Sequence, residues 1–426
     1  MALFVSPPMG QGACQGNLEG DIRSLADCVY RLDGRAANSA SPSDIWRIKL
    51  KGQLVHKGMP VNSAWLKVFI SNPTRSMRST DGLLYELRVY RDVVDKLLDH
   101  LVCPNFVRYL SSTTKCSYRD VRRLLDRQDI KEMNLLRSLG YMTKGSRDQS
   151  SGSMASGMPR RKRPAINERV STPEAKIIKH MHLDTRRLQF GMLLTQDRVV
   201  KTLSDWFTRH TSDSDFACMM LQVAAALRAM ELSRFVHNDL HLKNILVELC
   251  DETTNVMYKV DGEDFGISAD FRVLVFDFDR AYVQQLGSNA LVYRHKAYAH
   301  DFVAGHDLGS VLIQLFKRCS KWQGALLEKA FNVKAGHYMK KLRGKSVPTF
   351  ASVDRGRRRL LTGERATHRN AYVRFDAAPV VQDMASMVSA MRVLHKEIEY
   401  TCSEFDADAT YVCKRSRFHS DGSLRS

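Results

Sequence analysis

The chain has 426 residues, of which 44% are hydrophobic and 26% charged, and 65 Lys and Arg against 46 Asp and Glu give a net charge of +19. These proportions are typical of a globular protein in water, and the length predicts one large bilobal unit or two domains. No apolar run reaches the ~18 residues of a membrane-spanning helix, and Pro7 and Pro8 interrupt the apolar N-terminal stretch, so we expect neither a transmembrane helix nor a signal peptide. Nine cysteines lie singly along the chain without a Cys-x-x-Cys pair. This spacing argues against a disulfide framework and a zinc site, and it favours an intracellular compartment.

The positive charge is concentrated in two segments. Residues 334–369 contain eleven Lys and Arg against Asp354 and Glu364, a net charge of 11 − 2 = +9. A smaller cluster, Arg160 to Arg163, lies between two prolines. Such segments can bind nucleic acid, an acidic substrate or an anionic surface, and a solvated basic face is an equally good interpretation.

The first half of the chain predicts a small β-rich region. Residues 1–40 show little periodicity and are interpreted as an extension, whereas the runs IWRIKL and AWLKVFI, between residues 45 and 70, predict strands. Apolar residues at helical spacing predict a helix over 83–101, followed by a short strand in NFVRYL. Residues 119–186 contain a Gly- and Ser-rich run followed by basic residues, which predicts a flexible insertion.

The second half begins with a predicted strand, LQFGMLLTQ, and a short helix, TLSDWF. Ser212 has the position of a helix cap, and apolar residues follow a helical period from Phe216 to Met230. A loop with the sequence VHNDLHLKNILV comes next. The order of the elements in the two halves resembles that of a two-lobed kinase.

Within this loop His237, Asp239 and Asn244 fit the pattern H-x-D-x-x-x-x-N of the kinase catalytic loop. The spacing suits phosphoryl transfer, because the aspartate reaches the acceptor hydroxyl while the asparagine turns back toward a magnesium ion on the phosphates. Apolar residues at both ends predict an irregular loop between buried strands. A surface loop that happens to be rich in His and Asn is the alternative interpretation.

Two Asp-Phe pairs compete for the second magnesium ligand. Asp264 begins the familiar Asp-Phe-Gly tripeptide but follows a polar, turn-like sequence, so we interpret it as part of a loop in an enlarged hairpin. Asp277 follows the apolar run Val273 to Phe276, which predicts a buried strand that directs the carboxylate at the phosphates. The sequence therefore predicts Asp277 as the metal ligand and an insertion at about residues 248–272. Asp270, in a third pair, begins the strand and is given no role.

With both motifs placed, the chain resembles protein kinases, most closely the divergent serine/threonine kinases of large cytoplasmic DNA viruses such as iridoviruses. The segments that carry the resemblance are LLYELRVYRDVV, PNFVRYL, FGMLLTQ, VHNDLHLKNILV and VFDFDRA, within about residues 45–315. It implies an α+β, bilobal protein kinase-like fold with a small β-rich N-lobe and a larger, mainly helical C-lobe. The expected boundaries are an extension at 1–40, an N-lobe at 41–195, a C-lobe at 196–400 and a C-terminal tail at 401–426.

The resemblance also implies roles for residues outside the two motifs. Lys67 matches the strand lysine that contacts the α- and β-phosphates, and Glu86 matches the glutamate that pairs with it. Asp307 resembles the buried aspartate that supports the catalytic loop, although a helix-capping aspartate would look the same. The remaining ATP-binding candidates are the hinge residues Leu194 and Thr195 and the glycines Gly52 and Gly58.

The chain also departs from the family pattern at several positions. Asn238 replaces the usual arginine, and His241 stands where protein kinases carry a lysine, as in small-molecule phosphotransferases of the aminoglycoside-kinase type. Gly52 and Gly58 are the only glycines where a glycine-rich phosphate loop is expected. No Ala-Pro-Glu follows Asp277.

The leading hypothesis is an ATP- and Mg²⁺-dependent protein kinase that phosphorylates Ser or Thr hydroxyls of protein substrates. A small-molecule phosphotransferase on the same fold is the second hypothesis. A kinase-like scaffold that binds nucleic acid or an acidic partner through residues 334–369 is the third. The host cytoplasm, the virion and the nucleus all remain open as locations, and no membrane association is expected.

Overall fold

The computed structural model describes twelve stretches of the chain. These are residues 16–17, 29–35, 44–57, 59–71, 81–126, 189–197, 200–208, 211–289, 292, 298–333, 386–398 and 407–425. The fold is mixed α and β, and the chain divides into two compact units, one made of residues 1–80 and 110–197 and the other of residues 81–109 and 198–426. No helix in the described stretches has the length and apolar character needed to span a membrane.

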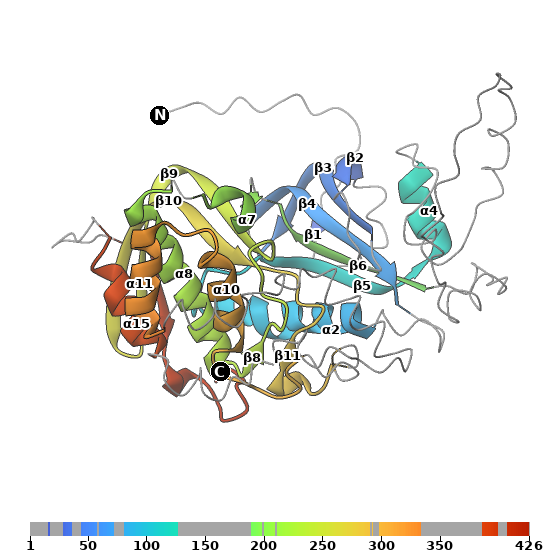
Figure 1. Cartoon of the computed structure of the whole chain (residues 1–426). Helices are drawn as coiled ribbons and strands as arrows, with labels where there is room; N and C mark the ends of the chain where they lie inside the picture. Colours follow the sequence, from blue (N-terminus) through green and yellow to red (C-terminus); the bar gives the residue numbers. More distant parts are fainter. Residues whose placement is uncertain are drawn as a thin grey trace, which may run out of the picture. The chain divides into compact units, whose positions relative to one another are not determined.

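The first unit contains a six-stranded sheet in the order β1-β3-β4-β6-β5, with β2 paired to β3 (Figure 1). The central strands β3 (Asp44–His56), β4 (Met59–Ile70) and β6 (Gln189–Gln196) are antiparallel neighbours. They confirm the strands predicted at 45–70 and in LQFGMLLTQ. β5 (Tyr109–Ser117) starts later than predicted, because Phe106 only bridges Val275 and the continuous strand begins at Tyr109.

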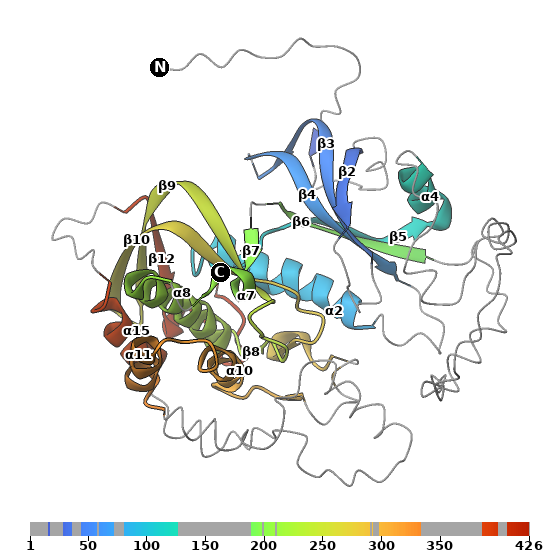
Figure 2. The same ribbon diagram turned by 45° about the horizontal axis from the view of Figure 1, so that its top comes forward.

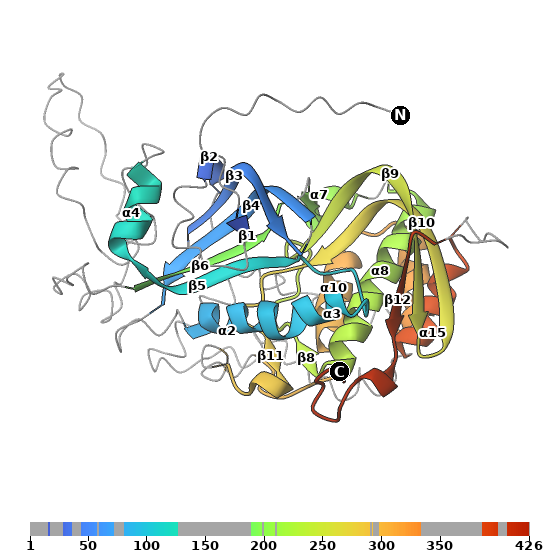
Figure 3. The same ribbon diagram turned by 180° about the vertical axis from the view of Figure 1, so that it is seen from behind.

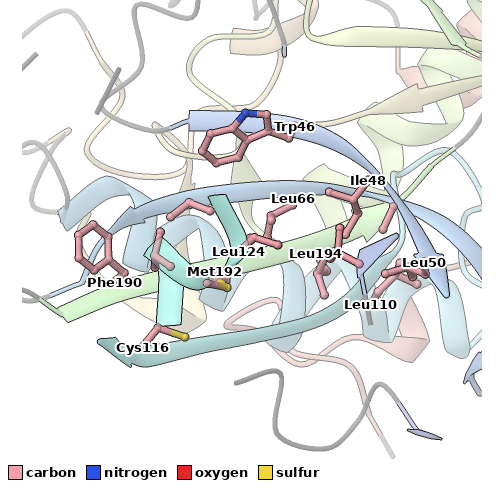
Figure 4. Packing of buried hydrophobic residues seen from close by; sticks show 14 of the residues in the cluster. Trp46, Ile48, Leu50, Leu66, Leu110, Cys116, Leu124, Phe190, Met192 and Leu194 are labelled. Atoms are coloured by element: carbon pink, nitrogen blue, oxygen red, sulfur yellow. The ribbon is translucent and has the colours of Figure 1, made fainter. Parts of the chain in front are cut away.

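Apolar residues alternate along these strands, and the ones that share a face of the sheet pack together as a hydrophobic core (Figure 4). Trp46 and Ile48 of β3, Leu66 of β4 and Leu194 of β6 are buried in it. The helix α4 (Tyr118–Asp126) contributes Leu124 to the same cluster.

The predicted N-terminal extension is corrected in part. β1 (Gly16–Asn17) pairs in parallel with β3, and β2 (Val29–Arg35) pairs with β3 in antiparallel fashion. Val29 is buried in the core cluster. The edge of β3 offers unpaired backbone groups, and these short strands satisfy them although their own sequence is not strongly periodic.

The predicted helix at 83–101 is confirmed and contains an irregular turn. It consists of α2 (Asp81–Val89), the π-helical turn η3 (Tyr90–Val94) and α3 (Asp95–Asp99). The prediction assigned this helix to the first lobe, whereas it groups with the second unit. The reason is its packing: the buried Tyr85 hydroxyl donates to the carbonyl of Gly287 and accepts from the amide of Val283. Burial raises the pKa of this phenol to about 12 and keeps it neutral.

The second unit is organised around the buried helix α8 (Asp213–Leu232) and the long hairpin of β9 (Ile245–Val260) and β10 (Glu263–Val275) (Figures 2 and 3). The Ser212 hydroxyl caps α8 by accepting from the amide of Asp215. The hairpin accounts for the insertion predicted at 248–272.

The remaining elements of the second unit are short. They are β7 (Val200–Thr202), α7 (Leu203–Trp206), β8 (Phe235–Val236), β11 (Tyr282–Val283), η5 (Gln284–Leu286), α10 (His306–Leu315), α11 (Lys321–Phe331), α15 (Met387–His395), β12 (Ala409–Cys413) and η6 (Arg415–Arg417).

The segment predicted to be a C-terminal tail is instead a structural strand. β12 pairs in parallel with the far half of β9, from Ala409 opposite Val256 to Cys413 opposite Val260 (Figure 3). Cys413 is buried, and Tyr411 lies beside the ring of Tyr258. The long β9 provides an edge that β12 covers, so residues 409–413 complete the sheet.

Several predicted features lie outside the described residues. These are the part of the insertion after Asp126, the cluster Arg160 to Arg163, and the basic segment 334–369. Their interpretations stay predictions.

Candidate active site

The predicted catalytic loop is an irregular segment between two buried strands of the second unit. It follows β8 and leads into β9, whose first residue, Ile245, is buried like Phe235 and Val236. Inside the loop the amide of His241 donates to the carbonyl of Asp239 at 2.8 Å, and the amide of Asn244 donates to the carbonyl of His241 at 2.7 Å. Two successive turns therefore fix the backbone between Asp239 and Asn244.

Asp307, on α10, supports the start of this loop. Its side chain is buried in the first turn of α10 and accepts from the amide of His237 at 2.7 Å and from the amide of Asn238 at 3.0 Å. Charge-assisted bonds of this length are about twice as strong as neutral ones. Through these two hydrogen bonds the carboxylate orients the backbone immediately before Asp239.

Asn238 connects the loop to a distant part of the same unit. Its side-chain amide donates to the carbonyls of Arg280 and Ala299, both at 3.1 Å, and its oxygen accepts from the amide of Ala299 at 2.8 Å. The residue has φ of 66°, a left-handed conformation that asparagine tolerates better than most residues. The neutral side chain of Asn238 thus links the loop to residues 280 and 299.

Arg280 is a site residue that the sequence analysis missed. Its guanidinium donates from Nη1 to Oδ2 of Asp239 at 2.8 Å, lies 3.8 Å from the Asp279 carboxylate and sits over the ring of Tyr298. Burial lowers the pKa of Arg280, but the carboxylates of Asp239, Asp279 and Asp277 outweigh this effect and the net pKa is raised. A permanent positive charge therefore stands beside Asp239. The only available signal was an arginine three positions after Asp277.

Asp277 lies directly after the buried end of β10. It has φ of 67°, so the chain turns sharply at this residue, and its amide donates to the hydroxyl of Tyr90 at 3.4 Å. The ring of Phe278 is fully buried and packs at 4.9 Å against Tyr90 and at 5.3 Å against His237. These contacts anchor the backbone of Asp277 and the residue that follows it.

His237 joins the two motifs. Its Nε2 lies 2.8 Å from the carbonyl oxygen of Phe276, and because a carbonyl oxygen only accepts, the proton is on Nε2. The amide of Phe276 in turn donates to the carbonyl of Asn244 at 3.3 Å. The catalytic-loop and metal-ligand candidates are therefore parts of one hydrogen-bonded cluster.

A buried polar network holds β10 in register behind this cluster. The side chain of Asn105 donates to Gln222 at 3.1 Å and to the carbonyl of Val273 at 2.9 Å, while Gln222 accepts from the amide of Val273 at 2.8 Å. The hydroxyl of Tyr258 donates to Asn105 at 3.0 Å. Because every member is partnered, the network fixes the strand end that leads to Asp277.

The donor set suits a magnesium ion that is held together with phosphates. The side-chain amide nitrogen of Asn244 donates to the carbonyl of Asp239 at 3.1 Å, which leaves its oxygen as the atom able to bind a cation, and Asp277 supplies a carboxylate. No group of three or more His, Cys, Asp or Glu that could hold a metal by itself occurs in the described stretches. Magnesium commonly uses only one or two carboxylates and completes its shell with phosphates and water, so the residues present fit this ion.

His241 stands where the resemblance to protein kinases predicts a lysine. Burial lowers the pKa of its imidazole, and a backbone hydrogen bond and the carboxylate of Asp277 only partly oppose the shift. The side chain is therefore neutral at neutral pH. Arg280, not residue 241, carries the positive charge next to Asp239.

The other nucleotide-binding candidates are divided between the units. Lys67 is buried on β4 and faces Leu193 of β6 across the sheet, in the first unit, whereas Glu86 is buried on α2 in the second. The pairing of Lys67 with Glu86 stays a prediction. Leu194 and Thr195 lie at the end of β6, opposite Leu66 and Trp65.

The glycine candidates are placed only in part. Gly52 lies in β3 within a register irregularity between Lys49 and Leu54. Gly58 lies outside the described residues.

The two competing aspartates, Asp264 and Asp270, are exposed on β10. Asp264 lies in β10 itself, not in a loop as predicted, because the turn is formed by Asp261 and Gly262 and the hairpin resumes at Glu263. Asp264 is exposed and pairs with Lys259 at 2.8 Å. Asp270 is exposed in a bulge of the same strand.

No protein-family model matches the chain, and no curated protein matches it. Solved structures do match, among them "WaaP in complex with acyl carrier protein", with a TM-score of 0.31 and 13% sequence identity over 76% of this chain and 88% of that chain. The chemistry of the site follows from its own side chains.

Proposed function

We propose that the protein is a kinase-fold phosphotransferase that moves the γ-phosphoryl group of ATP to a Ser or Thr hydroxyl of a protein. The observation that carries the proposal is the cluster in which Asp307 fixes the loop before Asp239 while His237 ties that loop to the strand end before Asp277. Phosphoryl transfer needs this combination, because most of its catalysis is positioning and charge stabilisation.

In this proposal Asp239 accepts or orients the proton of the attacking hydroxyl. Arg280 keeps the carboxylate ionised and directed, because the 2.8 Å ion pair is only about one-sixth exposed at each side chain. The same guanidinium can stabilise negative charge that develops on the transferred group. Arg280 therefore takes over the positive charge that a lysine supplies in the family pattern.

Asn244 and Asp277 would hold magnesium, which, when bound, neutralises charge on the phosphates. Lys67, positioned by Glu86, would contact the α- and β-phosphates. Leu194 and Thr195 would bind adenine through their backbone, and Gly52 and Gly58 would contribute to the phosphate loop.

A small-molecule acceptor is the second candidate, and a specific observation favours it. The neutral His241 and the absence of an Ala-Pro-Glu sequence after Asp277 remove two features of the protein-kinase pattern. The transfer chemistry would be the same, and only the acceptor would differ.

Incubation of the full-length protein with Mg²⁺ and γ-labelled ATP tests the proposal, alone and with acidic and basic protein substrates. We expect label on protein that disappears in Asp239→Asn and persists in the control Asp270→Asn, an exposed residue of the same unit. Label in the Asp239→Asn protein at the wild-type rate would contradict the assignment. Hydrolysis or transfer of the γ-phosphate to small hydroxyl compounds, with no protein labelled, would favour the second candidate.

A further inference from the structure

A hollow in the second unit lies outside the candidate active site. It has a volume of about 610 Å³ and is lined by the end of α8, the segment at 302–304 and the C-terminal segment after β12. Its charged lining consists of Arg228, Arg234, Arg415 and Arg425 against Glu231, a formal net charge of 4 − 1 = +3 without His419.

Among the residues that the structure describes, Arg228 alone of these four arginines forms ion pairs with carboxylates. Arg228 donates to Asp261 at 2.7 Å and to Glu231 at 3.1 Å. Within the part of the chain that the structure describes, no carboxylate forms an ion pair with Arg234, Arg415 or Arg425. Three guanidinium groups around one hollow repel one another unless an anion lies between them.

The C-terminal segment presents its arginines from a fixed turn. Phe418 and Leu424 form an antiparallel bridge, the amide of Arg425 donates to the carbonyl of Arg417 at 2.9 Å, and the amide of His419 donates to the carbonyl of Ser423 at 2.8 Å. Gly422 closes the turn with φ of 87°. The hairpin fixes Arg425, and η6 immediately before it carries Arg415, so that both arginines of this segment line the hollow.

This hairpin docks tightly on the end of α8. A Cβ atom at Gly422 would lie 2.3 Å from the carbonyl oxygen of Ser233, so only glycine permits the approach. The next residue, Arg234, has φ of 51° and extends its guanidinium over the ring of Phe302 at 4.9 Å. The two arginine-bearing surfaces are therefore held together by backbone contact and not by the charges themselves.

We propose that this hollow, named here the arginine hollow, binds a phosphate dianion, either as a phosphate monoester on a protein side chain or as free phosphate. Planar guanidinium groups suit phosphate because each can donate two parallel hydrogen bonds, and clusters of arginines recognise phosphorylated peptides elsewhere. The buried Phe418 and the ring of Phe302 supply apolar wall for the carbon atoms of a monoester. The site needs no phosphoryl transfer by this protein, so it stands or falls independently of the proposed function.

Fluorescence polarisation with the full-length protein tests the proposal, using a labelled phosphoserine peptide and its unphosphorylated twin. We expect the phosphopeptide to bind at least tenfold more tightly than the twin. The double substitution Arg415→Gln with Arg425→Gln should weaken binding at least tenfold. Both residues are exposed, so the variant should fold, and thermal unfolding checks this.

Lys414→Gln is the matched control, because Lys414 is exposed beside Arg415 but does not line the hollow. We expect its affinity to stay within twofold of the wild type. Competition by inorganic phosphate separates the two sources: displacement at the phosphopeptide's own concentration assigns the hollow to free phosphate, and displacement only at far higher concentration assigns it to a phosphorylated side chain. Equal binding of the unphosphorylated twin, or an equal loss in Lys414→Gln, would overturn the proposal. The same measurement on Asp239→Asn without ATP should give unchanged affinity, whatever the transfer assay shows.

Discussion

The two ends of the hairpin β9–β10 carry the same residue pair in opposite surroundings. At one end Asp264 is exposed and pairs with Lys259, and Phe265 packs on the ring of His395. At the other end Asp277 turns at φ of 67° beside the hydroxyl of Tyr90, and Phe278 is fully buried. The element that precedes an Asp-Phe pair therefore decides what the pair can do. The buried end of β10 directs the carboxylate of Asp277, whereas the exposed part of the strand leaves the carboxylate of Asp264 in water.

The turn end of the hairpin, at residues 261–264 and named here the far end, makes contacts that stabilise the fold. The amide of Asp261 donates to the carbonyl of Cys413, and the Asp261 carboxylate accepts from Arg228 and from the amide of Arg415. Glu263 forms an ion pair with Arg392 of α15. Substitutions at the two ends should therefore have different effects. Changes near Asp277 should lower the rate of phosphoryl transfer, and changes near Asp264 should lower the stability toward unfolding.

The largest effect is expected for Asp277→Asn. Loss of a carboxylate that holds magnesium should reduce the transfer rate about 10³-fold, which corresponds to roughly 4 kcal/mol of transition-state stabilisation. The matched substitution Asp264→Asn removes the same charge at the other end of β10, where an exposed ion pair contributes about 0.2–1 kcal/mol to folding. Rates at saturating ATP, measured over a range of Mg²⁺ concentrations, compare the two variants. Equal loss in both would show that Asp277 is not the metal ligand.

Arg280→Gln should have the next largest effect, a decrease of about 10²-fold in kcat with a smaller change in KM. An uncharged side chain no longer orients Asp239, and the loss of one electrostatic partner in a shielded site typically costs this much. Arg280→Lys keeps the charge but not the planar fork, and should recover part of the rate. The acidic limb of the pH–rate profile should move to higher pH in Arg280→Gln and much less in Arg280→Lys. An unchanged pH–rate profile in Arg280→Gln would mean that the ion pair of Arg280 with Asp239 has only a structural role.

The sequence was sufficient for the parts of the site that local patterns encode. Spacing within VHNDLHLKNILV predicted an irregular loop, and the apolar run before Asp277 distinguished it from Asp264. Both are confirmed as structure, because flanking apolar residues fix a loop or strand end within a few residues. The catalytic and metal-binding roles themselves stay predictions.

Partners that are distant along the chain could not be predicted. Arg280 reaches Asp239 across 41 positions, and β12 pairs with β9 across about 150, from Ala409 to Val256. Neither contact leaves a periodic signal in its own segment, since an arginine in a loop and a five-residue strand each have many possible partners. The same reason explains why residues 1–40 and 401–426 were interpreted as an extension and a tail.

Gly422→Ala should lower stability without changing the chemistry. The new Cβ would approach the carbonyl of Ser233 at 2.3 Å in a backbone conformation that favours glycine. Displacement of the C-terminal hairpin should cost about 1–3 kcal/mol of the free energy of unfolding. Thermal unfolding should show a lower Tm, while transfer measured well below that temperature should stay within twofold. Ser420→Ala, in the same turn but exposed, is the control and should leave both measurements unchanged.

The smallest effect, and the sharpest in pH, is expected for Glu263→Gln at the far end. The side-chain hydrogen bond from Arg392 lowers the pKa of Glu263 below its ordinary value of 4.5. A carboxyl group whose pKa is lower in the folded chain stabilises the fold above its unfolded value and loses that contribution as the pH falls through the folded value. The Tm of the wild type should therefore slightly exceed that of Glu263→Gln at pH 7. The difference should shrink as the pH falls below 4.5 and disappear once Glu263 is protonated in the folded chain. Because both side chains are on the surface, added salt should reduce the difference as well. A Tm difference that persisted at low pH would mean that Glu263 stabilises the far end of the hairpin through packing and not through its charge.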